Sequence, residues 1–106
     1  MIKVGNDIVL ISRIEKSIKS ESFLSGVFTE KEREHCKKAQ SFAGVYAAKE
    51  AYFKALGTGI TRRLNTVEIL YDEKGKPYIS GEKNCDVSIS HDGDYAFAVV
   101  IIWEQI

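Results

Sequence analysis

The sequence has no excess of charge of either sign, because 15 lysine and arginine residues are balanced by 15 aspartate and glutamate residues. Such a chain lacks the overall field that attracts nucleic acid or an anionic membrane surface, and we expect neither as a partner. Any anionic ligand must therefore be held by a local group of charges.

The chain also has few cysteines and no long apolar segment. Cys36 and Cys85 show neither CxxC spacing nor a pattern of metal ligands, so we expect two reduced thiols in a cytoplasmic protein. No stretch approaches the roughly 20 apolar residues of a membrane helix, and no signal peptide is visible at the N-terminus. The 106 residues fit one domain, residues 1–106, and a domain this small would gain stability from oligomerisation.

The first half of the chain combines one strand pattern with several helix patterns. Residues 2–11 are typical of a buried strand interrupted by a polar pair. A short helix is expected over about 13–19, followed by a loop or short helix at 20–28. Thr29 and Glu32 form a capping box that predicts a helix running to about residue 38.

The longest helix is expected over roughly 42–56, with Ser41 as its N-cap and Gly57 as its C-cap. After it, the apolar period changes from that of helices to that of strands. Strands are predicted at 66–71, 77–80, 86–90 and 95–102. The sequence therefore predicts an α+β domain, with a long helix packed on an antiparallel meander.

Asp7 is the first candidate site residue, because it lies inside the apolar N-terminal strand. A buried carboxylate without a partner costs several kcal/mol, so we expect it to have one. That partner is either a structural salt bridge or hydrogen bond, or a metal ion.

Glu50 and Lys54 are the second candidate pair, four residues apart on the long helix. The spacing suits an exposed ion pair worth a few tenths of a kcal/mol. However, Ala43, Ala47 and Ala51 surround Glu50, and a solvated face does not need small residues. Two carboxylates from distant segments, with a lysine beside one of them, are what a magnesium-dependent phosphate-transfer site requires.

His91 ends a predicted strand, where it is either an exposed turn residue or a donor to a phosphate. Ser90 and His91 fall on opposite strand faces, which argues against a Ser-His-Asp triad. The basic pairs at 37–38 and 62–63 are typical of solvated surface.

Five segments, taken in order, resemble the 4'-phosphopantetheinyl transferases, specifically the short bacterial holo-[acyl-carrier-protein] synthase type. These segments are Gly5–Val9, Ala47–Ala51, Leu56–Ile60, Gly75–Pro77 and Val87–His91. The resemblance covers nearly the whole chain. It implies a family-like α+β fold and transfer of 4'-phosphopantetheine from coenzyme A to a serine of apo-acyl carrier protein.

The resemblance also implies the other product, adenosine 3',5'-bisphosphate, and a homotrimer with active sites between subunits. Mg²⁺ would be bound by Asp7 and Glu50, and Lys54 would lie near the pyrophosphate. These three residues would be catalytic. Arg13 would face the acidic carrier protein. His91 and the turn of Gly75, Lys76 and Pro77 would hold the nucleotide end of coenzyme A.

The sequence departs from the family pattern at three places. Val45 occupies a position where the family usually has an arginine that contacts a coenzyme A phosphate. Arg62, Arg63 or Lys49 would have to supply that contact. Asn6 replaces a usual aliphatic residue, and the segment between Asp7 and Glu50 is short. Two alternatives therefore remain: an inactive family-like module that binds carrier protein or nucleotide, and a small Mg²⁺-dependent phosphohydrolase.

Overall fold

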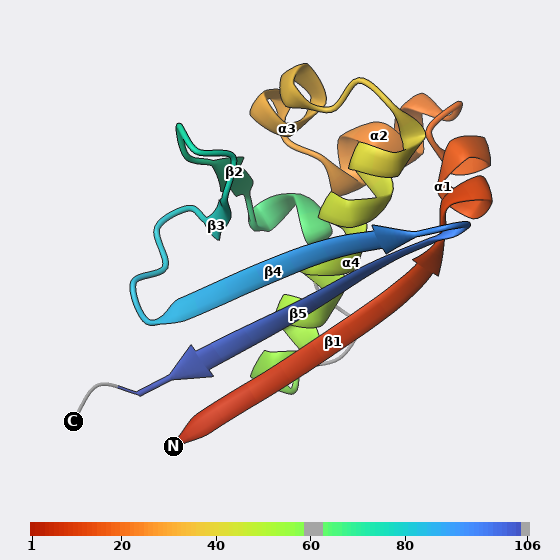
Figure 1. Cartoon of the computed structure of the whole chain (residues 1–106). Helices are drawn as coiled ribbons and strands as arrows, with labels where there is room; N and C mark the ends of the chain where they lie inside the picture. The colour runs from red at the N-terminus through yellow and green to blue at the C-terminus, as the bar shows by residue number, and fades with distance from the viewer. Residues whose placement is uncertain (59–62, 105–106) are drawn as a thin grey trace.

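A three-stranded antiparallel sheet packed on one long helix forms the centre of the molecule, and the computed structural model describes residues 1–58 and 63–104 (Figure 1). The sheet order β1-β5-β4 places the first strand beside the last. In chain order the elements are β1 (Ile2–Leu10), α1 (Ile11–Ser17), α2 (Glu21–Val27), α3 (Glu30–His35), α4 (Ala39–Leu56), the 3₁₀ turn η2 (Leu64–Thr66), β2 (Ile69–Tyr71), β3 (Pro77–Ile79), β4 (Cys85–Asp92) and β5 (Tyr95–Trp103).

The α4 helix begins earlier than the sequence predicts and ends where predicted. Its N-cap is Lys38, without a side-chain cap, so the prediction that Ser41 is the N-cap is wrong. Gly57 closes the helix in the left-handed conformation, with φ 76°, as predicted for a C-cap glycine. The helix is buried on most sides because the sheet covers one side, and α1 and β2 also pack against it.

The sheet buries one face against α4 and leaves the other open. Ala96, Ala98 and Val100 of β5 are fully buried on the helix side. Gly5 of β1 also lies on this side, where an added Cβ would sit 2.0 Å from the carbonyl oxygen of Ala51. A glycine is therefore required for β1 to approach α4 so closely. The side chains that alternate with these residues on β1 and β5 point to the open face.

The predicted α+β class is confirmed, but the strands are divided between two sheets. β2 and β3 form a separate two-stranded sheet. The strand predicted at 66–71 begins only at Ile69, because Thr66 belongs to the 3₁₀ turn η2 and the next two residues lie outside any strand. β2 and β3 pair over only three residues each. In the turn that joins them, Asp72 Oδ1 accepts from the amides of Lys74 and Lys76, both at 2.9 Å.

The short helices α2 and α3 begin at side-chain caps. The capping box of Thr29 and Glu32 is present as predicted, and Ser20 caps α2. Among the described residues no helix is long and apolar enough to cross a membrane.

Candidate active site

Asp7 lies on the helix-facing side of β1, between the buried residues Gly5 and Val9. Its side chain is 15% exposed, and its Oδ1 is 3.0 Å from the Nζ of Lys54 on α4. The expectation that this carboxylate has a partner is confirmed. The contact joins residues 47 positions apart and places the carboxylate against the C-terminal half of α4.

Glu50 lies one turn before Lys54 on the same edge of α4, because residues four apart lie above one another on a helix. Glu50 is partly buried. The ion pair recorded for Lys54 is with Asp7 rather than with Glu50. Since the Lys54 side chain is 55% exposed, it has room to move toward a ligand. The strand carboxylate and the helix lysine are thus brought together, with Glu50 on the adjacent turn.

Tyr46, one further turn before Glu50, contacts Arg13 of α1. The Arg13 Nη2 donates to the Tyr46 hydroxyl at 3.1 Å, and its guanidinium carbon is 5.5 Å from the centre of the tyrosine ring. Partial burial raises the pKa of Tyr46, and the charge of Glu50 raises it further, whereas Arg13 lowers it. Arg13, Tyr46, Glu50 and Lys54 therefore follow one another along the same side of the molecule, from α1 down α4.

The prediction that Lys49 contacts substrate is wrong, because its side chain has no exposed surface. Its Nζ is 2.5 Å from Glu32 Oε1 and donates to the carbonyl oxygen of Val27 at 2.6 Å. Glu32 is equally buried and also accepts from the amides of Thr29 and Ile69. Desolvation lowers the pKa of Lys49, while the charge of Glu32 opposes this change.

The other candidates for phosphate contact have different surroundings. Val45 is fully buried in the core, so this position contributes no charge to the surface. Arg63 is exposed at the start of η2. Arg62, and the end of the resembling segment Leu56–Ile60, lie outside the described residues.

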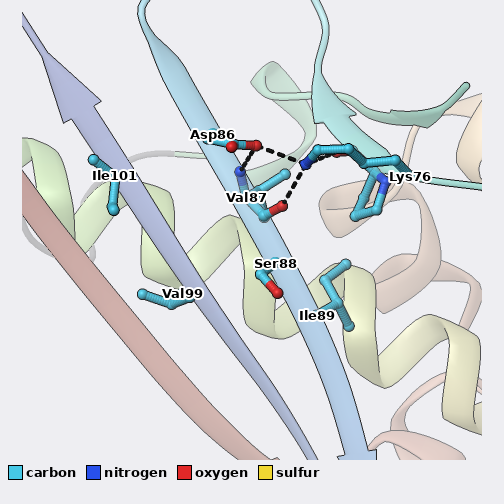
Figure 2. A pocket seen from close by; sticks show the side chains of 8 residues that line it. Lys76, Asp86, Val87, Ser88, Ile89, Val99 and Ile101 are labelled. Atoms are coloured by element: carbon cyan, nitrogen blue, oxygen red, sulfur yellow. Dashed lines mark hydrogen bonds and ion pairs between the residues drawn. The ribbon is translucent and has the colours of Figure 1, made fainter.

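The turn of Gly75, Lys76 and Pro77 lies beside β4, at the edge of the sheet opposite the Asp7 strand. The Lys76 Nζ is 2.7 Å from Asp86 Oδ1 and also donates to the carbonyl oxygen of Val87 at 3.2 Å (Figure 2). A groove of about 380 Å³ lies here, lined by Lys76, Pro77 and strand residues that include Ser88 (Figure 2).

His91 is near neither Lys76 nor Asp7 in the strand register. It lies toward the end of β4, where its Nε2 is 3.1 Å from the carbonyl oxygen of Gln40 at the start of α4. Because β5 lies between β1 and β4, Asp7 and His91 belong to opposite edges of the sheet. Strands are about 4.8 Å apart, so these edges are separated by roughly 10 Å. One copy of the chain therefore brings Asp7, Lys54 and Arg13 to one side and leaves His91 and Lys76 on the other.

Two features were not expected from the sequence: the contact of Tyr46 with Arg13 and the burial of Glu32. The signal that could have distinguished Tyr46 from a core residue of the helix is its hydroxyl, four residues before Glu50. Glu32 was expected only as a capping residue. Its pairing with Lys49 depends on contact between α3 and α4, which no local pattern reveals.

The architecture and these side chains define a class of protein: an α+β domain with two acidic residues and a lysine where a strand meets a long helix. A family model described as the 4'-phosphopantetheinyl transferase superfamily matches residues 3–100. This chain belongs to that superfamily.

Named relatives and solved structures agree with this assignment. A holo-[acyl-carrier-protein] synthase of Fusobacterium nucleatum is 40% identical over 120 residues, covering 96% of this chain and 98% of that relative. Another, from Geobacillus sp., is 43% identical and covers 96% of each chain. The Helicobacter pylori holo-[acyl-carrier-protein] synthase in complex with coenzyme A has a TM-score of 0.88 at 35% identity, covering 94% of this chain and 99% of that one.

Proposed function

We propose that this chain is a holo-[acyl-carrier-protein] synthase whose catalytic centre is the edge where β1 meets α4. It transfers the 4'-phosphopantetheine group of coenzyme A to a serine hydroxyl of apo-acyl carrier protein. The serine oxygen forms a new bond to the β-phosphorus, the pyrophosphate bond breaks, and adenosine 3',5'-bisphosphate leaves. The observation that carries the assignment of this edge is the contact of Asp7 with Lys54, beside Glu50.

Asp7 and Glu50 are the residues proposed to hold Mg²⁺. Carboxylate oxygens suit this ion, which takes one or two of them and completes its shell with water and substrate phosphates. Asp7 is only slightly exposed and its present partner is a half-exposed lysine, so an incoming ion would replace one positive neighbour with another. The bound ion would polarise the attacked phosphate and offset the charge of the leaving group.

Lys54 is proposed to stabilise the leaving bisphosphate. Its Nζ is at the same edge as Asp7, and its half-exposed side chain can turn toward the pyrophosphate when a metal takes its place. Either Glu50 or a water molecule at this edge takes the proton from the serine hydroxyl.

We propose a homotrimer in which one copy supplies what the neighbouring copy lacks. The open sheet face exposes large apolar side chains, including Val4 and Ile8 at 62% each and Phe97 at 39%. An apolar surface of this kind is typical of an interface. In the proposed trimer, the turn around Lys76, and His91, would lie beside the Asp7 edge of a neighbouring copy, because one copy keeps both segments apart from Asp7. Their proposed nucleotide-binding role depends on this assembly.

Arg13 is the proposed contact for the acidic carrier protein. It is exposed on α1, immediately after the Asp7 strand, and lies beside the edge where transfer would occur. We also place the protein in the cytoplasm, where coenzyme A and apo-carrier protein would be its partners.

The function is tested by mass spectrometry of a carrier protein. Purified protein is incubated with coenzyme A, Mg²⁺ and apo-acyl carrier protein, and the intact carrier is weighed. The expected result is a mass gain of one phosphopantetheine group that disappears when a chelator removes the metal. No mass gain with any carrier tried would contradict the transferase function, and a gain that survives chelation would contradict the metal assignment.

A further inference from the structure

The open face of the sheet carries a polar residue in the middle of an apolar surface. On β1, the side chains that point to this face are Ile2, Val4, Asn6, Ile8 and Leu10. Asn6 is exposed and lies between Val4 and Ile8, which are each 62% exposed. Among the residues that the structure describes, none makes a hydrogen bond with its side-chain amide. Within one copy of the chain, this amide therefore has only water to bind.

The surroundings of Asn6 on this face are uncharged. Asn6 pairs with Val99 of β5, and Val99 pairs in turn with Ser88 of β4. The residues of β5 that alternate with its buried ones are all aliphatic or aromatic, from Tyr95 to Trp103. This surface offers no charge to an acidic carrier protein. An equally uncharged surface suits it better, and the same face of another copy is such a surface.

An asparagine in an apolar surface matters once that surface is covered. Its amide then loses water, and association is weakened unless other polar groups replace the water. The open face provides such groups through the amide itself, which both donates and accepts, and through the hydroxyls of Ser88 and Ser90 on β4. Two apolar faces can meet in several registers, whereas an amide is satisfied only where a polar group meets it. In coiled coils, a single buried asparagine fixes register and subunit number in this way.

We propose that Asn6 fixes the register in which copies of this chain pack their open faces, and so restricts the assembly to one number of subunits. The inference rests on the proposed function, because it takes the homotrimer as the assembly. A ring of three closes only if every interface repeats the same rotation, which a single register ensures. The register also decides whether Asp7 of one copy meets Lys76 and His91 of the next. Asn6 thus gives a structural role to one of the positions where this chain departs from its family.

The test moves the amide along β1 without changing the composition of the face. The swapped variant combines Val4→Asn with Asn6→Val, which shifts the amide by two residues on the same side of the strand. Native mass spectrometry over a range of protein concentrations counts the subunits. We expect the wild type to give trimers alone. The swapped variant should give several subunit numbers, or dissociate at a concentration at least about 10-fold higher, because its amide meets no matching group.

The two single variants separate the loss of the amide from its misplacement. Asn6→Val alone should still assemble, but into more than one number of subunits, because an apolar face has no preferred register. Val4→Asn alone adds an unmatched amide, so its trimer should dissociate at a concentration at least about 10-fold higher than that of the wild type. Both positions are exposed in one copy, so circular dichroism should remain native in all three variants.

The outcomes separate this inference from the function it rests on. If the swapped variant or Asn6→Val forms only trimers at wild-type concentrations, the register role of Asn6 is overturned and the trimer stands. If Val4→Asn dissociates no more readily than the wild type, this face is not the interface, and the inference is overturned as well. A monomeric wild type overturns the assembly together with the inference. The mass gain of the carrier protein, measured separately, still decides the transferase function.

Discussion

Replacing Lys49 by methionine should destabilise the fold strongly, although Lys49 touches no proposed substrate. The change keeps an unbranched apolar stem and removes the charged amino group. That group is fully buried and is bonded to Glu32 and to the carbonyl oxygen of Val27. The variant would leave an uncompensated carboxylate in the core, which still accepts from the amides of Thr29 and Ile69.

The size of the effect follows from this burial. Removing one partner of a buried ion pair costs about 3–5 kcal/mol, because the other charge is left unpaired in a poorly solvated position. For a domain of about 100 residues, each kcal/mol lowers the unfolding temperature by roughly 4–8 °C. The unfolding temperature of Lys49→Met should therefore fall by at least about 12 °C, measured by circular dichroism at one protein concentration.

Two further variants make this prediction specific. Lys54→Met removes a lysine whose side chain is 55% exposed, and its partner Asp7 keeps some contact with solvent, so this variant should cost less than Lys49→Met. Adding Glu32→Gln to Lys49→Met removes the unpaired charge and should recover part of the lost stability. The reasoning is refuted if Lys49→Met is no more destabilising than Lys54→Met, or if the double variant is less stable than Lys49→Met alone.

Four other predictions follow from the same structure. Asp7→Asn and Glu50→Gln should each lower transfer at least about 100-fold while circular dichroism stays native, because the metal loses a ligand; a variant that keeps wild-type rates would contradict its role. Phe97→Glu, on the open sheet face, should convert a trimer to monomers by light scattering, and a wild-type protein that is already monomeric would refute the proposed assembly. Arg13→Glu should raise KM for the carrier protein more than KM for coenzyme A, and added salt should mimic it; indifference to both would place docking elsewhere. Burial raises the pKa of the Cys36 thiol to about 12, so iodoacetamide should modify it at pH 8 only on unfolding, and rapid labelling of the native protein would contradict its burial.

Much of the fold could be predicted because its signals are local. The capping box at Thr29 and the C-cap at Gly57 depend on neighbouring residues, and both are present. The strand predicted at 95–102 followed from its apolar pattern, and the structure buries only one of its two faces. The start of α4 could not be placed, because the helix extends before Ser41 without a recognisable side-chain cap.

The candidate site was only partly visible in the sequence. A carboxylate in an apolar strand needs a partner, and this predicted that Asp7 would be paired, without naming Lys54. Lys49 was considered for a phosphate contact because Val45 stands where the family usually has an arginine. Its true partner, Glu32, lies on another helix, and the contact between the two helices is set by tertiary packing. The Arg13–Tyr46 contact depends on the packing of α1 in the same way.

The central claim is that Asp7 and Glu50 share one divalent ion where β1 meets α4. Crystals grown with coenzyme A and Mn²⁺ test it most directly, through the anomalous signal of the metal. We predict one strong peak within about 2.2 Å of an oxygen of each carboxylate, close to the distances of a hard six-coordinate ion. Two carboxylates more than about 6 Å apart could not share such an ion. That separation, or a metal bound elsewhere, would contradict the account.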